Sequence, residues 1–190
     1  MTKLLTAVAP GLLTTLALGL ITACATAPQT RYYNLQVMSE LNSTQLARTI
    51  ELPTGTTFGI GPVKLPSMLQ RKGIVTQTSG PTIKVASHDI WAGRLKEDFT
   101  RVTAALMAAN LGIDDIVSEP WDTRFRPEYQ LQMDVQQFSG ELGGEVYFKV
   151  NWLLSGSYGR DKLVSQSDTF VLKIEDTSYA AYVTALSTLL

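Results

Sequence analysis

The sequence predicts a mixed α/β fold, an α+β sandwich with a mostly antiparallel sheet and two principal helices packed on one face. Three observations predict this fold class. Several segments alternate apolar and polar residues with a period of two, one long segment has helical spacing, and the last residues return to helical spacing. The chain has 190 residues, of which 45% are hydrophobic and 17% charged, which fits one globular domain with a sizeable core.

The first 23 residues, "MTKLLTAVAPGLLTTLALGLITA", have the layout of an export signal. They carry one cation, Lys3, ahead of an apolar stretch and end in small residues. The apolar stretch 12–23 is about 12 residues long, whereas a helix needs about 20 to span the hydrocarbon core. Extending it upstream would run a helix through Pro10. Residues 1–23 are therefore expected to be a signal peptide rather than a permanent transmembrane helix.

Cys24 is the only cysteine, so the chain can form no intrachain disulfide and no cysteine-rich metal cluster. The preceding residues, Ile21-Thr22-Ala23, resemble the lipobox of bacterial lipoproteins. This resemblance implies lipidation of Cys24 by a diacylglycerol thioether, cleavage before it and acylation of its amine. The alternatives to lipidation are a signal peptide cut elsewhere or a free thiol. Residues 24–30 would form a short lipidated tether, and an alanine directly after the cysteine, as at Ala25, resembles the pattern of outer-membrane-directed lipoproteins.

The segments that follow the tether are expected to form strands. The stretches 31–37, "RYYNLQV", and 57–63, "TFGIGPV", are rich in strand formers, with a polar loop over 39–56 between them. A Ser-Gly-Pro turn joins segments 74–78 and 82–86, which predicts a hairpin. The Gly-x-Gly within 57–63 precedes a proline and no helix, so it indicates a closely packed strand rather than a phosphate-binding loop.

The clearest helical pattern runs from Ser87, the expected N-cap, to Gly112, the expected stop. Its apolar side chains recur at spacings of three and four: Trp91, Leu95, Phe99, Val102 and Leu106. This stripe is expected to cover the sheet, with docking of a partner or lipid as the alternative. The only histidine, His88, lies between Ser87 and Asp89, and adjacent residues at a helix start diverge, so no catalytic triad is predicted.

The last third of the chain predicts three sequential strands separated by short turns, and hence an antiparallel meander. The expected strands of the meander are 129–138, 145–156 and 163–174, after a separate short strand within 116–121. A closing helix is expected from Tyr179, with Asp176 or Thr177 as its cap.

The charge balance excludes some classes of partner. Sixteen Lys and Arg residues against seventeen Asp and Glu give a net charge of −1, without the basic excess that nucleic-acid binding requires. The carboxylates are scattered, so the sequence predicts no enzyme and no cofactor beyond the covalent lipid on Cys24. A cell-envelope hydrolase would need a nucleophile and an orienting group clustered around one histidine.

One loop, "KLPSMLQRKG" (64–73), places apolar residues among turn residues and cations. Apolar groups rimmed by charge predict a contact surface for a partner, whereas a loop tucked under the sheet is the other interpretation. The candidate partner-contact residues are Lys64, Leu65, Pro66, Met68, Leu69, Arg71 and Lys72.

Several stretches, in order, resemble the ABC-type transport auxiliary lipoprotein family. They are "YYNL" (32–35), "IGPVKLP" (60–66), "IVTQTSG" (74–80), "WAGRL" (91–95), "EPW" (119–121) and "YQLQMDVQQFSGELGGEVYFKVNWLL" (129–154). The chain departs from the family at Ile90, where an arginine is common, and at Lys72-Gly73, where Pro-Gln is common.

The resemblance implies that residues 31–190 form an auxiliary lipoprotein domain without enzymatic activity. It implies an outer-membrane lipoprotein that faces the periplasm, assembles into a ring-like homo-oligomer and receives a periplasm-spanning MCE-domain protein in intermembrane lipid transport. A second hypothesis is a periplasmic lipid-binding carrier with an apolar cavity between sheet and helices. The carrier would copurify with lipid as a monomer, whereas the docking subunit would form oligomers without stoichiometric lipid.

Overall fold

The computed structural model describes residues 28–38, 55–78, 80–113, 116–122 and 124–190, and in these ranges it holds two sheets and two α helices. The strands are β1 (Arg31–Tyr33), β2 (Phe58–Lys64), β3 (Gly73–Gln77), β4 (Ile83–Trp91), β5 (Ile116–Ser118), β6 (Tyr129–Gly140), β7 (Glu145–Gly156) and β8 (Asp161–Lys173). The helices are α2 (Leu95–Leu111) and α3 (Tyr179–Thr188), with short 3-10 helices η2 (Ser67–Gln70) and η3 (Ser157–Gly159).

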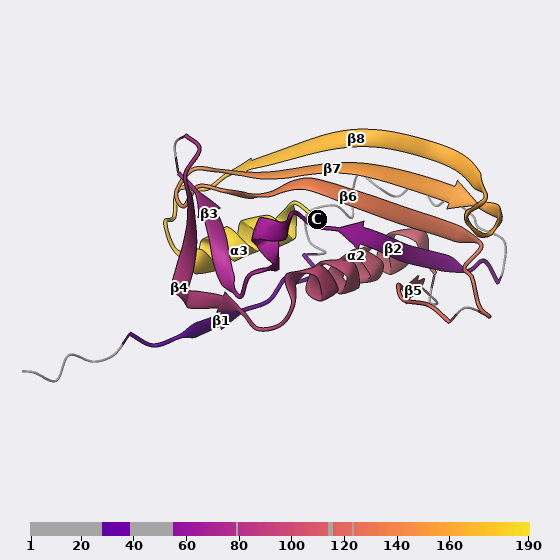
Figure 1. Ribbon diagram of the computed structural model, residues 1–190, viewed down its shortest axis with the longest axis horizontal. Helices are drawn as coiled ribbons and strands as arrows, with labels where there is room; N and C mark the ends of the chain where they lie inside the picture. Colours follow the sequence, from indigo (N-terminus) through magenta and orange to yellow (C-terminus); the bar gives the residue numbers. More distant parts are fainter. Residues whose placement is uncertain (1–27, 39–54, 79, 114–115, 123) are drawn as a thin grey trace, which may run out of the picture.

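The larger sheet has the strand order β5-β2-β6-β7-β8, and the smaller one the order β1-β4-β3. Both helices lie beneath the long strands of the five-stranded sheet, and the three-stranded sheet stands at one end of it (Figure 1). Antiparallel pairing of β6, β7 and β8 over almost their full lengths forms the predicted meander. The predicted mixed fold, with a mostly antiparallel sheet and two helices on one face, is confirmed.

Three of the strand pairs are parallel, which the sequence did not indicate. Strand β2 pairs in parallel with β5 and β6, and β1 pairs in parallel with β4. Parallel partners need long connections, so local turn signals carry no information about them. Most of the predicted 39–56 loop, residues 39–54, lies outside the described residues.

The core between helices and sheet is closed by aromatic rings. Phe99 of α2 meets Phe138 of β6 and Phe148 of β7 edge to face, at centroid distances of 5.3 and 5.7 Å. The two strand rings meet each other at 5.6 Å, and such edge-to-face pairs stabilise beyond the area they bury. The helical stripe predicted to cover the sheet therefore does so, as the burial of Leu95, Phe99 and Val102 shows.

Tyr182 of α3 ties the two sheets together. Its hydroxyl accepts a hydrogen bond from the Gly140 N–H of β6 at 2.8 Å and donates one to the Val75 carbonyl of β3 at 3.0 Å. The side chain is fully buried, and burial raises the pKa of its phenol above the ordinary range. Both predicted caps of this helix, Asp176 and Thr177, are wrong, because the N-cap is Ser178, whose side chain accepts from Ala181 N–H.

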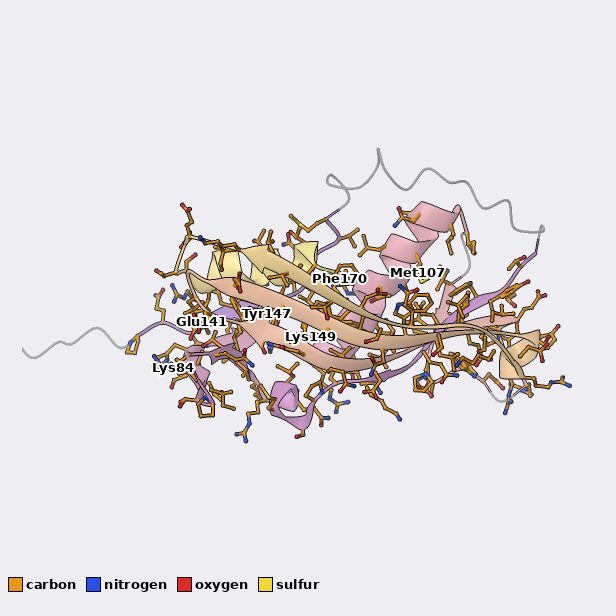
Figure 2. The ribbon with its side chains drawn as sticks, turned by 90° about the horizontal axis from the view of Figure 1, so that it is seen from above. Lys84, Met107, Glu141, Tyr147, Lys149 and Phe170 are labelled. Carbon is orange, nitrogen blue, oxygen red and sulfur yellow. The ribbon has the colours of Figure 1, made fainter. Side chains whose placement is uncertain are left out.

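The other face of the five-stranded sheet is open. Figure 2 looks onto it and shows Tyr147 and Lys149 of β7, whose ammonium lies 5.3 Å from the centre of the tyrosine ring. Polar residues alternate with the core-facing ones along β6 and β7, as the period-two pattern predicted.

The expected start of the long helix is wrong. Ser87 is no N-cap, because β4 continues through Trp91 and α2 begins at Leu95 after Arg94. Buried Asp89 explains the extension: its carboxylate accepts from Arg31 Nε at 2.7 Å and from the Tyr33 hydroxyl at 2.9 Å, across the β1–β4 pairing. These partners come from a distant segment, so helical spacing alone could not reveal them. The predicted stop at Gly112 is confirmed.

The first strand is also shorter than expected, since β1 ends at Tyr33 and Leu35 enters the core without being part of a strand. The packed-strand interpretation of the Gly-x-Gly is confirmed. A methyl group on Gly59 would lie 2.3 Å from the Pro127 ring, so only glycine fits there.

Candidate functional site

A groove of about 860 Å³ lies where β1, β4, η2 and the start of α2 meet. Its lining comes from three separated parts of the chain: Tyr32, residues 65 and 70–72, and residues 90–97. We refer to it as the basic groove, because Arg71, Lys72, Arg94 and Lys96 contribute to the lining and Glu97 is the one carboxylate among them.

The floor of the basic groove is apolar. Leu65, Trp91 and Leu95 are buried, with 9%, 6% and 4% of their surface exposed. Two backbone hydrogen bonds hold this floor: Trp91 N–H donates to the Lys72 carbonyl at 2.8 Å, and Ala92 N–H donates to the Tyr33 carbonyl at 2.7 Å. The loop after η2, the end of β4 and the end of β1 are thus fixed to one another around the tryptophan.

The rim of the basic groove is positively charged. Arg94 pairs with Glu97 at 2.9 Å on the exposed first turn of α2. Arg71, Lys72 and Lys96 are exposed and form no ion pair with any other residue that the structure describes. The groove therefore presents three uncompensated cations above an apolar floor, an arrangement suited to an anionic, amphipathic ligand.

The segment that follows β1 is fastened to α2 beside the groove. Leu35 N–H donates to the Asp98 carboxylate, and the Leu35 carbonyl accepts from Arg101 Nη2 at 2.9 Å. Asp98 and Arg101 pair with each other on the helix surface. These contacts fix the path of the chain from residue 31 onward, so the end of the expected tether has a defined position relative to the groove.

The seven predicted partner-contact residues do not form one surface. Three line the basic groove, three line a hollow of about 140 Å³ against β6, and one borders a third depression on the open face of the sheet. In that order they are Leu65, Arg71 and Lys72; Pro66, Met68 and Leu69; and Lys64.

The premise of exposed apolar groups in this loop is wrong for two residues. Leu65 and Leu69 belong to the core, at 9% and 3% exposure, and Met68 packs against it. The tucked-loop interpretation describes their side chains. The cations of the loop remain exposed, and its role in contacting a partner stays a prediction.

The other candidates from the sequence are His88 and Cys24. His88 lies in β4, where it is exposed while its neighbour Asp89 points into the structure, so the two side chains lie on opposite faces. The described part of the chain holds no group of three His, Cys, Asp or Glu side chains arranged for a metal ion. Cys24 lies outside the described residues. No helix in the described ranges is long and apolar enough to span a bilayer.

The sequence pointed to only three residues that line the basic groove, Leu65, Arg71 and Lys72. It missed the others, including Tyr32, Arg94 and Lys96. The signal was present in "WAGRL" (91–95), which was assigned to the interior of a helix. Gly93 within it interrupts helical propensity and marks the connection between β4 and α2. The approach of Tyr32 depends on the parallel β1–β4 pairing, for which no local signal exists.

Two solved structures support the fold, with TM-scores above 0.6. A crystal structure described as that of an uncharacterized protein aligns with a TM-score of 0.66 at 22% identity, over 85% of this chain and 91% of that one. Protein XCC0632 from Xanthomonas campestris, of the family DUF330, aligns with a TM-score of 0.61 at 15% identity, over 84% and 87%. A PelC dodecamer from Paraburkholderia phytofirmans aligns with a lower TM-score of 0.40 at 14% identity, over 71% of this chain and 84% of that one.

No curated protein matches the sequence. The model of one family does, the ABC-type transport auxiliary lipoprotein component, over residues 33–190. The match takes in every described strand from β2 onward, both helices and the whole lining of the basic groove except Tyr32. The chain belongs to the family of ABC-type transport auxiliary lipoprotein components.

Proposed function

We propose that this chain is an outer-membrane-anchored lipoprotein, facing the periplasm, that serves as the docking subunit of an MCE-type intermembrane lipid transport system. The observation that carries the proposal is the family match over residues 33–190, together with the lipobox-like residues before Cys24. The role is non-enzymatic: the domain holds a partner at the membrane and does no chemistry on the cargo.

The anchor is the lipid on Cys24. Each buried methylene contributes about 0.8 kcal/mol to membrane binding and one acyl chain binds only marginally, so the several chains of a lipidated cysteine give stable attachment. Palmitate supplied to growing cells is expected to label the wild-type protein and not the Cys24→Ala variant. Equal labelling of the two would refute the anchor. Density-gradient separation of the membranes then distinguishes the outer from the inner one.

The docking face is the side of η2 that turns away from the basic groove, where Pro66 and Met68 line the hollow against β6. Lys64, at the end of β2, lies two residues before Pro66. Support comes from the position of these residues: Lys64 is exposed, and Pro66 and Met68 are half-buried beside a hollow against β6. Leu65 and Leu69 lie under this face in the core and hold η2 in place. Partially exposed apolar groups beside a cation suit a protein contact.

Mild crosslinking in cells, followed by mass spectrometry of what purifies with the full-length lipoprotein, tests docking. An MCE-domain protein among the crosslinked products is the expected result. Only abundant envelope proteins in both the sample and a control with an unrelated outer-membrane lipoprotein would contradict the proposal.

A ring-like homo-oligomer is part of the proposal. The mass of the lipoprotein in detergent, measured by light scattering, is expected to be a multiple of the protomer mass without stoichiometric phospholipid. The carrier hypothesis expects a monomer with bound lipid. Its predicted cavity is disfavoured in the described part of the chain, where Phe99, Phe138, Phe148 and Tyr182 fill the space between sheet and helices.

A further inference from the structure

The basic groove is not part of the proposed docking face, and its positive charge suits a separate ligand. Among the residues that the structure describes, Arg94 is the one cation of the groove with a carboxylate partner, Glu97. Arg71, Lys72 and Lys96 come from two distant segments, yet the structure brings them to one groove without an ion pair among the described residues. Like charges held together repel, so an arrangement of this kind suits an anion bound between them.

The walls and floor of the groove indicate that its ligand also has an apolar part. Leu65, Trp91 and Leu95 form the buried floor, and Tyr32 stands at the side with 67% of its surface exposed. A tyrosine ring with an apolar body and a polar tip is the kind of side chain that sits at a membrane–water interface. A small inorganic anion would leave the floor uncovered, whereas a phospholipid headgroup with its glycerol would meet both the rim and the floor.

The position of the groove close to Cys24 in the sequence indicates that its ligand comes from the membrane. Tyr32 is eight residues after Cys24, and eight extended residues span about 29 Å at most. If Cys24 carries the lipid anchor, as in the proposed function, one wall of the groove lies within this distance of the bilayer. The cations then face a dense layer of phosphodiesters rather than open periplasm.

We propose that the basic groove binds the phosphodiester headgroup of anionic phospholipids in the membrane that holds the anchor. Arg71, Lys72 and Lys96 contact the phosphate, and the Tyr32 ring lies at the level of the headgroups. This contact orients the domain on the membrane, which leaves the opposite side of η2 free for the docking partner. The inference rests on the lipid anchor but not on the identity of the partner.

Hydrogen–deuterium exchange on the full mature lipoprotein tests the proposal. The protein is reconstituted into vesicles of phosphatidylcholine alone and into vesicles that also contain phosphatidylglycerol. Amides in 70–72 and 91–97 are expected to exchange more slowly with phosphatidylglycerol present, and added salt is expected to remove the difference because it screens exposed charges. Each basic residue near an anionic surface increases the affinity for that surface about fivefold. Removing three of them is therefore expected to weaken the affinity of the groove for phosphatidylglycerol about a hundredfold.

The test variant is the triple change Arg71→Gln, Lys72→Gln, Lys96→Gln. The matched control removes three other exposed cations by Arg126→Gln, Arg160→Gln and Lys162→Gln, just before β6 and around the start of β8, at the opposite end of the five-stranded sheet from β1 (Figure 1). Both variants lower the net charge equally. Only the groove variant is expected to lose the protection that phosphatidylglycerol gives.

Three results would overturn the proposal. The first is equal exchange in the two kinds of vesicle, and the second is equal loss of protection in the groove and control variants. The third is protection that requires an MCE-domain protein and not phosphatidylglycerol, which would assign the groove to an acidic segment of that partner. Flotation with vesicles of phosphatidylcholine alone measures the anchor separately, so failure of the anchor and failure of the groove are distinguishable.

Discussion

At the residue scale, the structure depends on a few side chains that satisfy distant partners at once. Tyr182 shows this most clearly, because its hydroxyl bonds Gly140 of one sheet and Val75 of the other. Asp89 does the same for β1 by accepting from Arg31 and Tyr33. Neither role could be read from sequence, since each depends on segments brought together only in the folded chain.

The Tyr182→Phe variant tests the first of these roles. It removes the hydroxyl and leaves the buried Gly140 N–H and Val75 carbonyl without this partner, and an unsatisfied buried group costs about 1–3 kcal/mol. The free energy of unfolding from urea denaturation is expected to fall by that amount. Tyr32→Phe, at an exposed ring, is the control and is expected to change it by less than about 0.5 kcal/mol. Equal effects would contradict the role of Tyr182 as a link.

The burial of Tyr182 also predicts that the stability of the fold depends on pH. Burial raises the pKa of Tyr182 in the folded chain, while in the unfolded chain the phenol ionises near pH 10. The unfolded state therefore loses the proton first, so stability is fully present below about pH 10 and falls as the pH rises further. Tyr182→Phe is expected to flatten this fall, leaving the smaller contributions of Tyr33 and Tyr147, whose pKa values are also raised. An unchanged slope in a denaturation series from neutral to alkaline pH would contradict it.

At the element scale, the sequence predicted what local patterns determine. The meander of β6, β7 and β8 followed from period-two alternation and short turns, and the end of α2 followed from Gly112. The start of α2 was misplaced because Trp91 is in phase with the helical stripe although it ends a strand. The basic groove went unrecognised because it requires the β1–β4 pairing and the Trp91–Lys72 hydrogen bond.

The helix stop can be tested directly. Gly112 has φ of 64°, the left-handed conformation that L side chains adopt at a cost of about 1 kcal/mol. Gly112→Ala is expected to lower the free energy of unfolding by about that much. Gly93→Ala is the matched control, because a methyl group there meets nothing within 4 Å and its φ is not positive. A larger loss from the control than from Gly112→Ala would contradict the assignment of the stop.

At the scale of the whole molecule, the two proposals place three features in order from the membrane outward. The expected anchor at Cys24 leads to β1, and β1 forms one wall of the basic groove. The short helix η2 lies between that groove and the proposed docking face of Pro66 and Met68. In the proposed arrangement, one side of the domain faces the membrane and another faces the partner. The four-residue η2 is the element that both sides share.

Site-specific photo-crosslinking in cells tests this arrangement most directly. A photoreactive amino acid replaces Ser67, which is exposed at the start of η2, and in a control replaces Ser167, which is exposed on β8. If η2 docks the partner, a crosslink to an MCE-domain protein is expected from position 67 and none from position 167. A crosslink of equal yield from both positions, or from 167 alone, would contradict docking through η2.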